Sequence, residues 1–341
     1  RRPPPHKRGF WGYRGGFFNI GAEGQLYLGA IATTWIGITL TDWPAWLLLP
    51  TTLLGAALAG ALWAAIPGYL KAARGFNEVL TTLLMNYIAI QLFNWVIRID
   101  QPQGWTWQFW TWLGIKDPTQ PFPKSADLAA GAQFPSLDTV LNNPTVGAVL
   151  AVIWPSYDVL LQIPAMRRFT LAGIVAVLAA VVIYLLLFKT TIGFRARAVG
   201  INPQAARYMG ISVPRTIMTT ALISGALAGL AAAMEIMGAQ HKVIENFLLN
   251  AGFDGIPVAL IGQLHPLGVL LSALFFGSLR AGANKMQIIT GVPVSIVFVI
   301  QSLAILFAIA GTTIDIKPRF SRNNRKPKAS PQSDHEEAEY A

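Results

Sequence analysis

The chain contains long, mostly apolar blocks, such as Leu171 to Phe188 and Val294 to Ile309. A helix of about 20 apolar residues crosses the roughly 30 Å hydrocarbon core of a bilayer. Lipid offers no hydrogen bonds, so a spanning segment must pair its backbone groups internally, and repeated runs of this length favour helices. Only 12% of the residues are charged, whereas soluble domains carry about 25%. The sequence therefore predicts an all-α, polytopic membrane helical bundle.

We predict about eight spans, one of which is short or broken. Segment 252–264 reaches only about 20 Å as a helix, so it must face protein and not lipid over part of its depth. Segment 145–163 is apolar but contains Pro155 and Asp158, and we expect it to be an outer-face or re-entrant element. The predicted spans are 17–40, 44–66, 77–98, 169–188, 216–238, 252–264, 266–283 and 293–311.

The distribution of positive charge predicts the direction of these spans. Segments 67–76 and 189–215 carry Lys and Arg but no acid, whereas the Trp- and Pro-rich connection 100–144 carries more acids than bases. Because cytoplasmic loops are enriched in Lys and Arg, we expect both basic loops and both termini inside and the 100–144 connection outside. The net charge of +10 then reflects membrane topology, and no nucleic-acid partner is expected.

The chain divides into three regions by composition. Residues 1–16 form a basic N-terminal segment, which we interpret as an incomplete start. Residues 17–311 form the transmembrane domain. Residues 312–341 are polar and low in apolar side chains, which predicts a cytoplasmic tail that is largely disordered.

Sequence motifs for enzymatic chemistry are missing. The chain has no G-x-x-x-x-G-K-[ST] phosphate loop, no G-x-S-x-G, no H-E-x-x-H and no Cys-x-x-Cys. It has no cysteine at all, and its four histidines are scattered, so no metal site is expected. We therefore predict no catalytic residues and no enzyme activity.

A short polar helix is predicted between two spans, at residues 202–210. Asn202 followed by Pro203 is typical of a helix start, and Gly210 is typical of a helix end. Small residues on the exposed face would allow close approach of a partner. Either the helix is a lever pushed by a soluble protein, or it rests on lipid headgroups. Its candidate residues are Asn202, Pro203, Ala205, Ala206, Arg207, Tyr208, Met209 and Gly210, among which we expect Ala205, Ala206 and Gly210 to be exposed.

Polar residues within the spans are candidates for a translocation path or a hinge, because buried polar groups in membranes usually face a cavity or a partner. For Glu23 we favour a structural hinge over substrate contact, and for Asp254 a helix cap. Asn77 with Glu78 is expected to cap a helix. The candidates are Asn19, Glu23, Gln25, Asn86, Gln91, Phe253 and Asp254.

Two further patterns concern helix faces. Asn86, Gln91 and Asn94 are expected on roughly one face of their helix, where they either line the path or bond to a neighbouring helix. Gly225-x-x-x-Gly229 allows close contact between helices, which is a packing role.

Four ordered stretches are similar to the branched-chain amino acid, sugar and nucleoside permease family of bacterial ABC importers. They are Phe18 to Gln25, Phe76 to Thr82 with Met85 to Ile88, Thr190 to Ile211, and Gly252 to Ile256 with Leu264 to Gly268. The sequences FNIGAEGQ and NEVLTT resemble the nucleoside or simple-sugar branch most. The sequence departs from the family because members normally have further spans before the first of these stretches, and because 139–168 is longer than usual.

The resemblance implies a function and partners. The chain would be the permease subunit of an importer in the bacterial inner membrane, moving a nucleoside or simple sugar by alternating access. Segment 202–210 would be the coupling helix that docks on a separate ATP-binding subunit, so ATP would bind there and no cofactor on this chain. A second permease subunit, homologous or identical, and an external solute-binding protein would complete the complex.

The alternative is a secondary transporter driven by an ion gradient. Such a protein would need acidic or histidine residues in mid-span for proton or sodium relay. In this sequence most of the few candidates lie near predicted helix ends.

Overall fold

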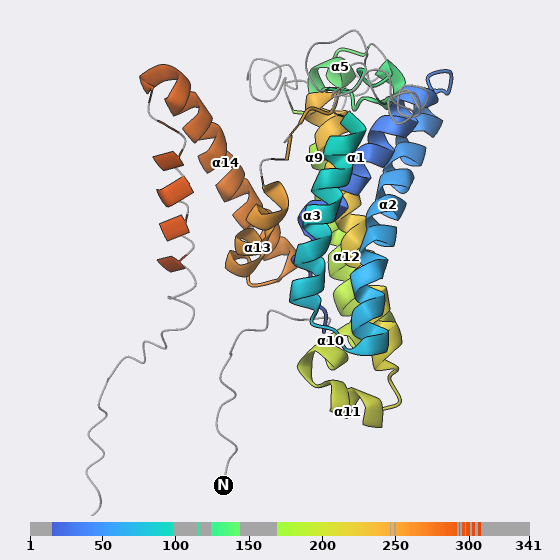
Figure 1. Ribbon diagram of the computed structural model, residues 1–341. Coiled ribbons are helices and arrows are strands. Elements are labelled where there is room, and N and C mark those ends of the chain that lie inside the picture. Colours follow the sequence, from blue (N-terminus) through green and yellow to red (C-terminus); the bar gives the residue numbers. More distant parts are fainter. Residues whose placement is uncertain are drawn as a thin grey trace, which may run out of the picture.

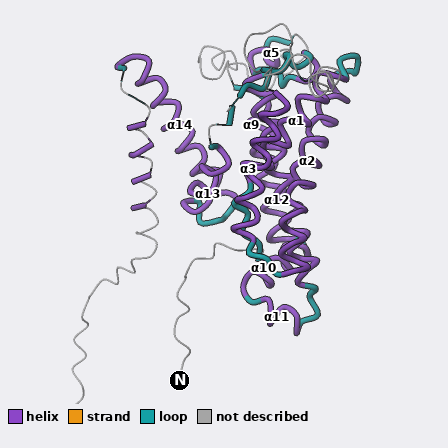
Figure 2. Tube along the Cα trace, viewed as in Figure 1, coloured by secondary structure: helices purple, strands orange, loops and turns teal. Residues whose placement is uncertain are grey.

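The computed structural model describes residues 16–97, Ile115, residues 124–143 and residues 169–291 without 246 and 249, together with scattered positions from 293 to 307. The described elements are helices that run side by side (Figures 1 and 2). Five are long and apolar enough to cross a membrane, which confirms the predicted all-α membrane bundle. They are α2 (Ala45–Arg74), α3 (Glu78–Ile97), α9 (Leu171–Lys189), α12 with the turn after it (Val213–Gln240) and α14 (Pro266–Thr290).

Several helices have ends that differ from the predicted spans. Helix α1 (Ala22–Thr39) begins later than predicted, whereas α2 and α14 run past the predicted ends at 66 and 283. Hydropathy marks only the apolar part of a helix, and the hydrogen-bond ladder continues until a residue stops it. Gly75 and Gly291 do so here, because both have the left-handed φ that glycine adopts readily (70° and 69°).

Some predictions lie outside the described residues. These are the predictions for the N-terminal segment 1–15, for the tryptophan-rich part of the 100–144 connection, for segment 145–163, for much of the last predicted span at 293–311, and for the tail 312–341.

The centre of the bundle is a close packing of α1, α2 and α12. Gly225 and Gly229 of α12 lie against the backbone of Gly60 and Ala56 in α2, and a Cβ on Gly29 of α1 would lie 2.6 Å from the Gly229 Cα. The backbones of these helices are therefore too close for any side chain at these positions. The predicted packing role of the Gly225-x-x-x-Gly229 pattern is confirmed, and the pattern holds two neighbouring helices at once.

Helix α3 packs against α1 through an aromatic cluster. The rings of Tyr27 (α1) and Phe93 (α3) have centroids 4.6 Å apart, and Phe247 lies 5.6 Å from the former and 5.5 Å from the latter. All three side chains are buried. Contacts of this kind add about 0.5–1.5 kcal/mol per pair to the hydrophobic burial. The cluster therefore fixes Phe247, in the connection between α12 and α13, against the side of α1 and α3.

The predicted short helix is α13 (Ala251–Ile261), and it belongs to a broken crossing. Helix α12 ends in a single wider turn, η2 (Ile236–Gln240), after which His241 takes a left-handed φ of 56°. The described residues from His241 to Asn250 are not helical, and α13 begins part-way down the bundle before α14 runs back (Figure 1). A helix that begins inside the bundle needs partners for its first N–H groups.

The two ends of the bundle carry different elements. Helices α10 (Thr191–Ile201) and α11 (Pro203–Tyr208) lie at the same end as the connection between α2 and α3 (Figure 1). Elements η1 (Ala130–Ala132) and α5 (Leu137–Leu141) lie at the opposite end. The two acid-free basic segments therefore share one end, as the charge distribution predicts.

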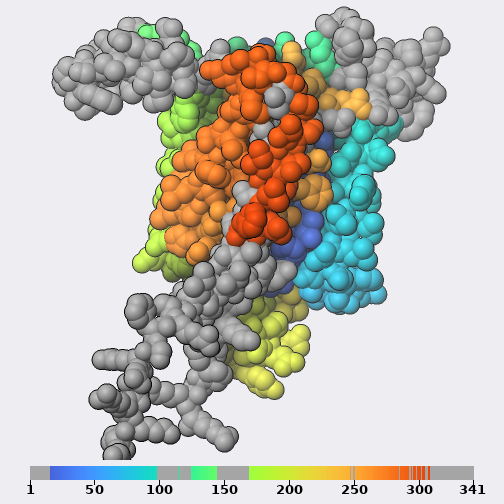
Figure 3. Space-filling view, turned by 90° about the vertical axis from the view of Figure 1, so that its left-hand side faces the viewer, coloured from blue at the N-terminus to red at the C-terminus, as the bar shows by residue number. Residues whose placement is uncertain are grey.

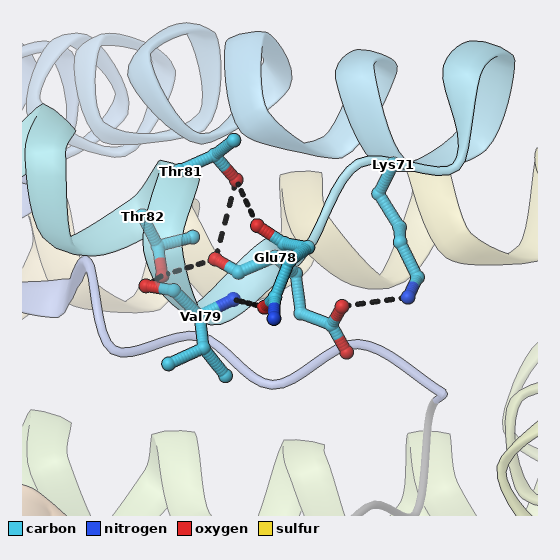
Figure 4. A network of polar contacts seen from close by, with 6 residues as sticks. Lys71, Glu78, Val79, Thr81 and Thr82 are labelled. Carbon is cyan, nitrogen blue, oxygen red and sulfur yellow. Dashed lines mark hydrogen bonds and ion pairs between the residues drawn. The ribbon is translucent and has the colours of Figure 1, made fainter.

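The connection between α2 and α3 is held by a small polar network (Figure 4). Lys71 Nζ lies 2.6 Å from Glu78 Oε2, and the Asn77 side chain accepts a hydrogen bond from Val79 N at 3.0 Å. The Thr82 hydroxyl donates to the Glu78 carbonyl at 2.6 Å. The predicted cap at Asn77, with Glu78 in the first turn of α3, is confirmed.

Candidate functional site

Four of the predicted polar candidates gather around the start of α1: Asn19, Glu23, Gln25 and Asn86. Asn19 and Gln25 exchange amide hydrogen bonds at 2.8 and 3.0 Å, and Asn19 Nδ2 also donates to Ser224 Oγ of α12 at 2.8 Å. Gln25 is buried. A buried amide without partners would cost about 1–3 kcal/mol, so this pairing is what permits Gln25 inside the bundle. It also ties the segment before α1 to α12.

Asn86 of α3 caps the start of α1 from the side. Its Oδ1 accepts a hydrogen bond from Gly24 N at 2.8 Å, and its Nδ2 donates to the Ile20 carbonyl at 3.0 Å. The side chain is 2% exposed. Helix α1 has no cap from its own preceding residue, so Asn86 supplies an acceptor that the local sequence lacks.

Glu23 of α1 performs the same task for α13. Its Oε2 accepts a hydrogen bond from Gly252 N at 2.6 Å, and the side chain is 2% exposed. A Cβ on Gly252 would lie 2.5 Å from Glu23 N, so only glycine allows this approach. The carboxylate sits at the positive end of the α13 dipole, where an anion is stabilised. We call Asn19, Glu23, Gln25, Asn86, Ser224 and Gly252 the polar junction.

Asp254 does not cap α13, which corrects the sequence-based interpretation. Its Oδ2 lies 3.2 Å from Arg280 Nη1 of α14, while the residue in the cap position is Asn250 with a left-handed φ of 65°. The ion pair joins α13 to α14. Phe253, the other candidate here, is partly buried in the first turn of α13.

The expectation that Asn86 and Gln91 share a face of α3 is wrong. Asn86 lies on the buried face with Thr82, Ala89 and Phe93, whereas Gln91 is exposed. Five residues advance a helix by about 500°, which leaves the two side chains about 140° apart. Gln91 lines a shallow hollow on the outer face of α3, together with Tyr87, Ile88, Leu92 and Trp95.

The short helix predicted at 202–210 is α11, and its caps are as predicted. Asn202 Oδ1 accepts hydrogen bonds from Gln204 N and Ala205 N at 2.9 and 3.1 Å, and Pro203 occupies the first turn. Gly210 ends the helix with a φ of 76°. The structure thus reproduces the start and the end that the sequence predicts.

The exposure expected for one residue of α11 is wrong. Ala206 is fully buried, in a cluster with Phe17, Val199 and Val213, among others. Ala205, Arg207 and Gly210 are exposed, and so are Met209 and Tyr208, the latter to 94%. Helix α11 is short, and Ala206 lies on the side that packs against α10 and α12. The outward surface is therefore larger and more aromatic than expected.

Two residues of these networks were missed at the level of sequence. Ser224 precedes Gly225 in an apolar helix, where a lone serine is an ordinary packing residue. Arg280 lies within a predicted span, and a charge at that position was the available signal for a partner such as Asp254. Among the described residues no group of three or more potential metal ligands occurs.

Comparison with known proteins places the chain in a family. A sequence model of the family described as "Branched-chain amino acid transport system / permease component" matches residues 11–310. The chain belongs to this permease family. The match spans the whole described bundle, so the polar junction and α11 both lie within the matched residues. No solved structure matches the permease significantly.

Curated relatives of the permease are ABC transporter permeases. The guanosine ABC transporter permease protein NupP of Bacillus subtilis is 39% identical over 303 residues, which cover 89% of this chain and 76% of the relative. The glucose ABC transporter permease protein TsgB13 of Haloferax volcanii is 36% identical, covering 87% and 70%. The nucleoside ABC transporter permease protein NupB of Lactococcus lactis is 32% identical, covering 86% and 72%.

Proposed function

We propose that this permease imports a nucleoside or a simple sugar across the inner membrane by alternating access, driven by ATP hydrolysis on a separate subunit. The observation that carries the proposal is α11, a capped helix at the basic end of the bundle whose Tyr208 and Met209 project outward. Exposed aromatic side chains on a rigid helix are typical anchors of protein interfaces. Helix α11 is therefore the coupling helix in this proposal, and the ATP-binding subunit is its partner.

A neutral solute is supported by the way α13 begins. Broken helices in transporters often point a free N-terminus at an anionic substrate. Here the Glu23 carboxylate already accepts from Gly252 N, so that position is filled by the protein. The names of the relatives (guanosine, nucleoside, glucose) agree with a solute that carries hydroxyl groups and no fixed charge.

Gln91 is the proposed contact with the solute. An exposed amide on a membrane-spanning helix is costly in lipid, and α3 has no other described element over this face. Tyr87 and Trp95 lie one turn before and after Gln91, so a base or sugar ring could stack on an aromatic ring while it bonds to the amide. The second permease subunit, homologous or identical, would close this face. A solute-binding protein would deliver the solute from outside.

The remaining polar candidates have structural roles in this proposal. Glu23, Asn19, Gln25 and Asn86 hold helix ends together, so the junction acts as a hinge and the solute passes elsewhere. A proton relay through Glu23 is disfavoured, because its Oε2 holds the start of α13. An ion-gradient mechanism therefore finds no support at the one buried carboxylate of the junction.

Reconstitution tests the proposal. The permease would be co-expressed with its genomic neighbours, purified, and placed in liposomes with radiolabelled guanosine or glucose outside. We expect an ATPase to co-purify and uptake to require ATP on the ATPase side. We expect Gln91→Leu to lower uptake without reducing co-purification. Gln287→Leu, which removes an exposed amide from α14, serves as the control. Uphill uptake driven by a proton or sodium gradient alone would contradict the proposal.

A further inference from the structure

Three aromatic rings connect α9 to the turn between α13 and α14. Tyr184 and Phe188, near the end of α9, have ring centroids 5.2 Å apart. The His265 ring lies 5.6 Å from Tyr184 and 5.5 Å from Phe188. These separations are within the range of direct ring contact. His265 belongs to the Leu264 to Gly268 stretch, to which neither the coupling helix nor the solute path gives a role.

The same aromatic group touches the helix that precedes the proposed coupling helix. The guanidinium carbon of Arg197, on α10, lies 5.2 Å from the centre of the Phe188 ring, which is within the range of a cation–π contact. Arg197 Nε also donates to the Gly193 carbonyl at 3.4 Å. At Gly193 the chain bends so tightly that a Cβ would strike the Leu186 and Leu187 carbonyls. Helix α10 is therefore in direct contact with the end of α9, and a tilt of α10 would press on that end.

Helices α13 and α14 form a unit that can follow such a movement. Besides the Asp254–Arg280 ion pair, Ser272 Oγ donates to the Val258 carbonyl at 2.7 Å. Between the helices, Gln263 and Leu264 have left-handed φ values of 52° and 55°, which are unfavourable for residues with side chains. Figure 3 shows this pair, in orange, against the flank of the bundle beside α9. At the start of this unit, Gly252 belongs to the polar junction and donates its N–H to Glu23.

We propose that Arg197, Phe188 and His265 form a relay that transmits movement of α10 and α11 to the α13–α14 unit and so to the Glu23–Gly252 contact. The proposal rests on the proposed function, because it needs an ATPase that moves α11. The three residues are positioning residues: they bind neither ATP nor solute. Rings in contact pass on a displacement because closely packed interiors have low compressibility and transmit strain. Coupling through such a chain must still be shown by linked variants.

The test measures solute moved per ATP hydrolysed in the reconstituted complex, with guanosine or glucose, whichever the unaltered permease transports. We expect His265→Leu and Phe188→Leu to keep ATPase co-purification and basal hydrolysis near the unaltered level. Uptake per ATP should fall about tenfold, within the usual range of coupling between sites. The double variant should be no worse than either single one. His265→Phe keeps a ring and should recover most of the coupling.

Controls separate a relay from a loss of structure. Phe275→Leu removes an exposed α14 ring that contacts Phe276 and is not part of the relay, and it should leave coupling unchanged. If His265→Leu and Phe188→Leu fail to accumulate, the same measurement is made on Arg197→Leu, because the Arg197 side chain is partly exposed and its loss should disturb folding less. Unchanged coupling in the leucine variants or in Arg197→Leu, or no recovery with His265→Phe, would overturn the relay. Absence of any ATPase requirement in the unaltered permease would instead overturn the proposed function.

Discussion

Polar side chains of this permease stabilise helix ends that lie inside the bundle. Asn86 supplies the acceptor for the start of α1, and Glu23 supplies the acceptor for the start of α13. Each cap comes from a different helix, so each hydrogen bond is also a tertiary contact. In the hydrocarbon core no water is available to accept a hydrogen bond from an unpaired backbone N–H. These side chains therefore bind the broken crossing to the rest of the protein.

We expect Glu23→Leu to destabilise the permease by about 1–3 kcal/mol, because Gly252 N–H would lose its acceptor in a buried place. Glu23→Gln keeps an acceptor oxygen and loses only the charge at the end of the helix, so its effect should be smaller. Thermal unfolding of the purified protein in detergent measures both. Equal melting temperatures for Glu23→Leu and the unaltered protein would contradict the role of Glu23 as a cap.

Glycine at 229 permits the contact of α12 with both α1 and α2. Gly229→Ala would place a methyl group against the Ala56 carbonyl, and overpacking of this kind costs about 1–3 kcal/mol. Gly277→Ala is the matched control, because a Cβ there meets nothing within 4 Å and alanine favours a helix by up to about 1 kcal/mol. We expect a lower melting temperature only for Gly229→Ala. Equal shifts in the two variants would contradict the packing role.

At the scale of an element, one side of the short helix α11 packs against its own protein and the other side faces outward. Ala206 is fully buried, whereas Tyr208 is 94% exposed. A substitution at the former changes folding, and a substitution at the latter changes only the outer surface. The two positions therefore distinguish a coupling role from a structural one.

We expect Tyr208→Glu to leave membrane levels unchanged while it weakens ATPase co-purification and uptake, because it places an acid in the proposed interface, where an unpaired charge costs several kcal/mol. Ala206→Glu should instead lower the amount of folded permease, because it buries the acid among Phe17, Val199 and Val213. Quantitative immunoblotting and pull-down of the ATPase measure these effects. Normal co-purification and uptake by Tyr208→Glu would argue that α11 rests on headgroups.

The elements that sequence predicts well are those with a local signal. Asn202 with Pro203 determines where α11 begins, and long apolar runs locate α2, α9 and α12. The ends of α2 and α14 were predicted less well, because a helix continues past its apolar part. The faces of α3 and α11 were also missed in part. Which side of a helix is buried depends on neighbours such as α1 and α12, and no local pattern encodes that.

The candidate site was predictable as residue types but not as contacts. Glu23, Asn86 and Gln25 stand out as polar residues in apolar surroundings, which the sequence shows directly. Their partners Gly252, Gly24 and Asn19 include backbone groups, which carry no sequence signature. Only the fold reveals that helix ends meet at this depth, and so that these residues hold the bundle together.

At the scale of the whole molecule, the two ends of the bundle differ, and the basic segments lie at only one of them. Helices α10 and α11 lie at that end with the α2–α3 connection, and segment 124–143 lies at the opposite end (Figure 1). That segment is fastened by hydrogen bonds from Ser125 N to the Val243 carbonyl at 2.9 Å and from Phe134 N to the Met237 carbonyl at 2.8 Å. It covers the turn where α12 ends, and in the proposed function this is the end that would face a solute-binding protein.

The direction of the bundle in the membrane can be measured with single cysteines, because the chain has none of its own. Gln204→Cys lies on exposed α11, and Ala130→Cys lies on the exposed surface of η1 at the opposite end. Lys and Arg are retained on the cytoplasmic side, so a membrane-impermeant maleimide should label Ala130→Cys in intact cells. Gln204→Cys should react only after the cells are opened. Both positions are outside the apolar helices, so neither change should alter folding. Labelling of Gln204→Cys in intact cells would reverse the topology, and it would place α11 on the side where no ATP-binding subunit can reach it.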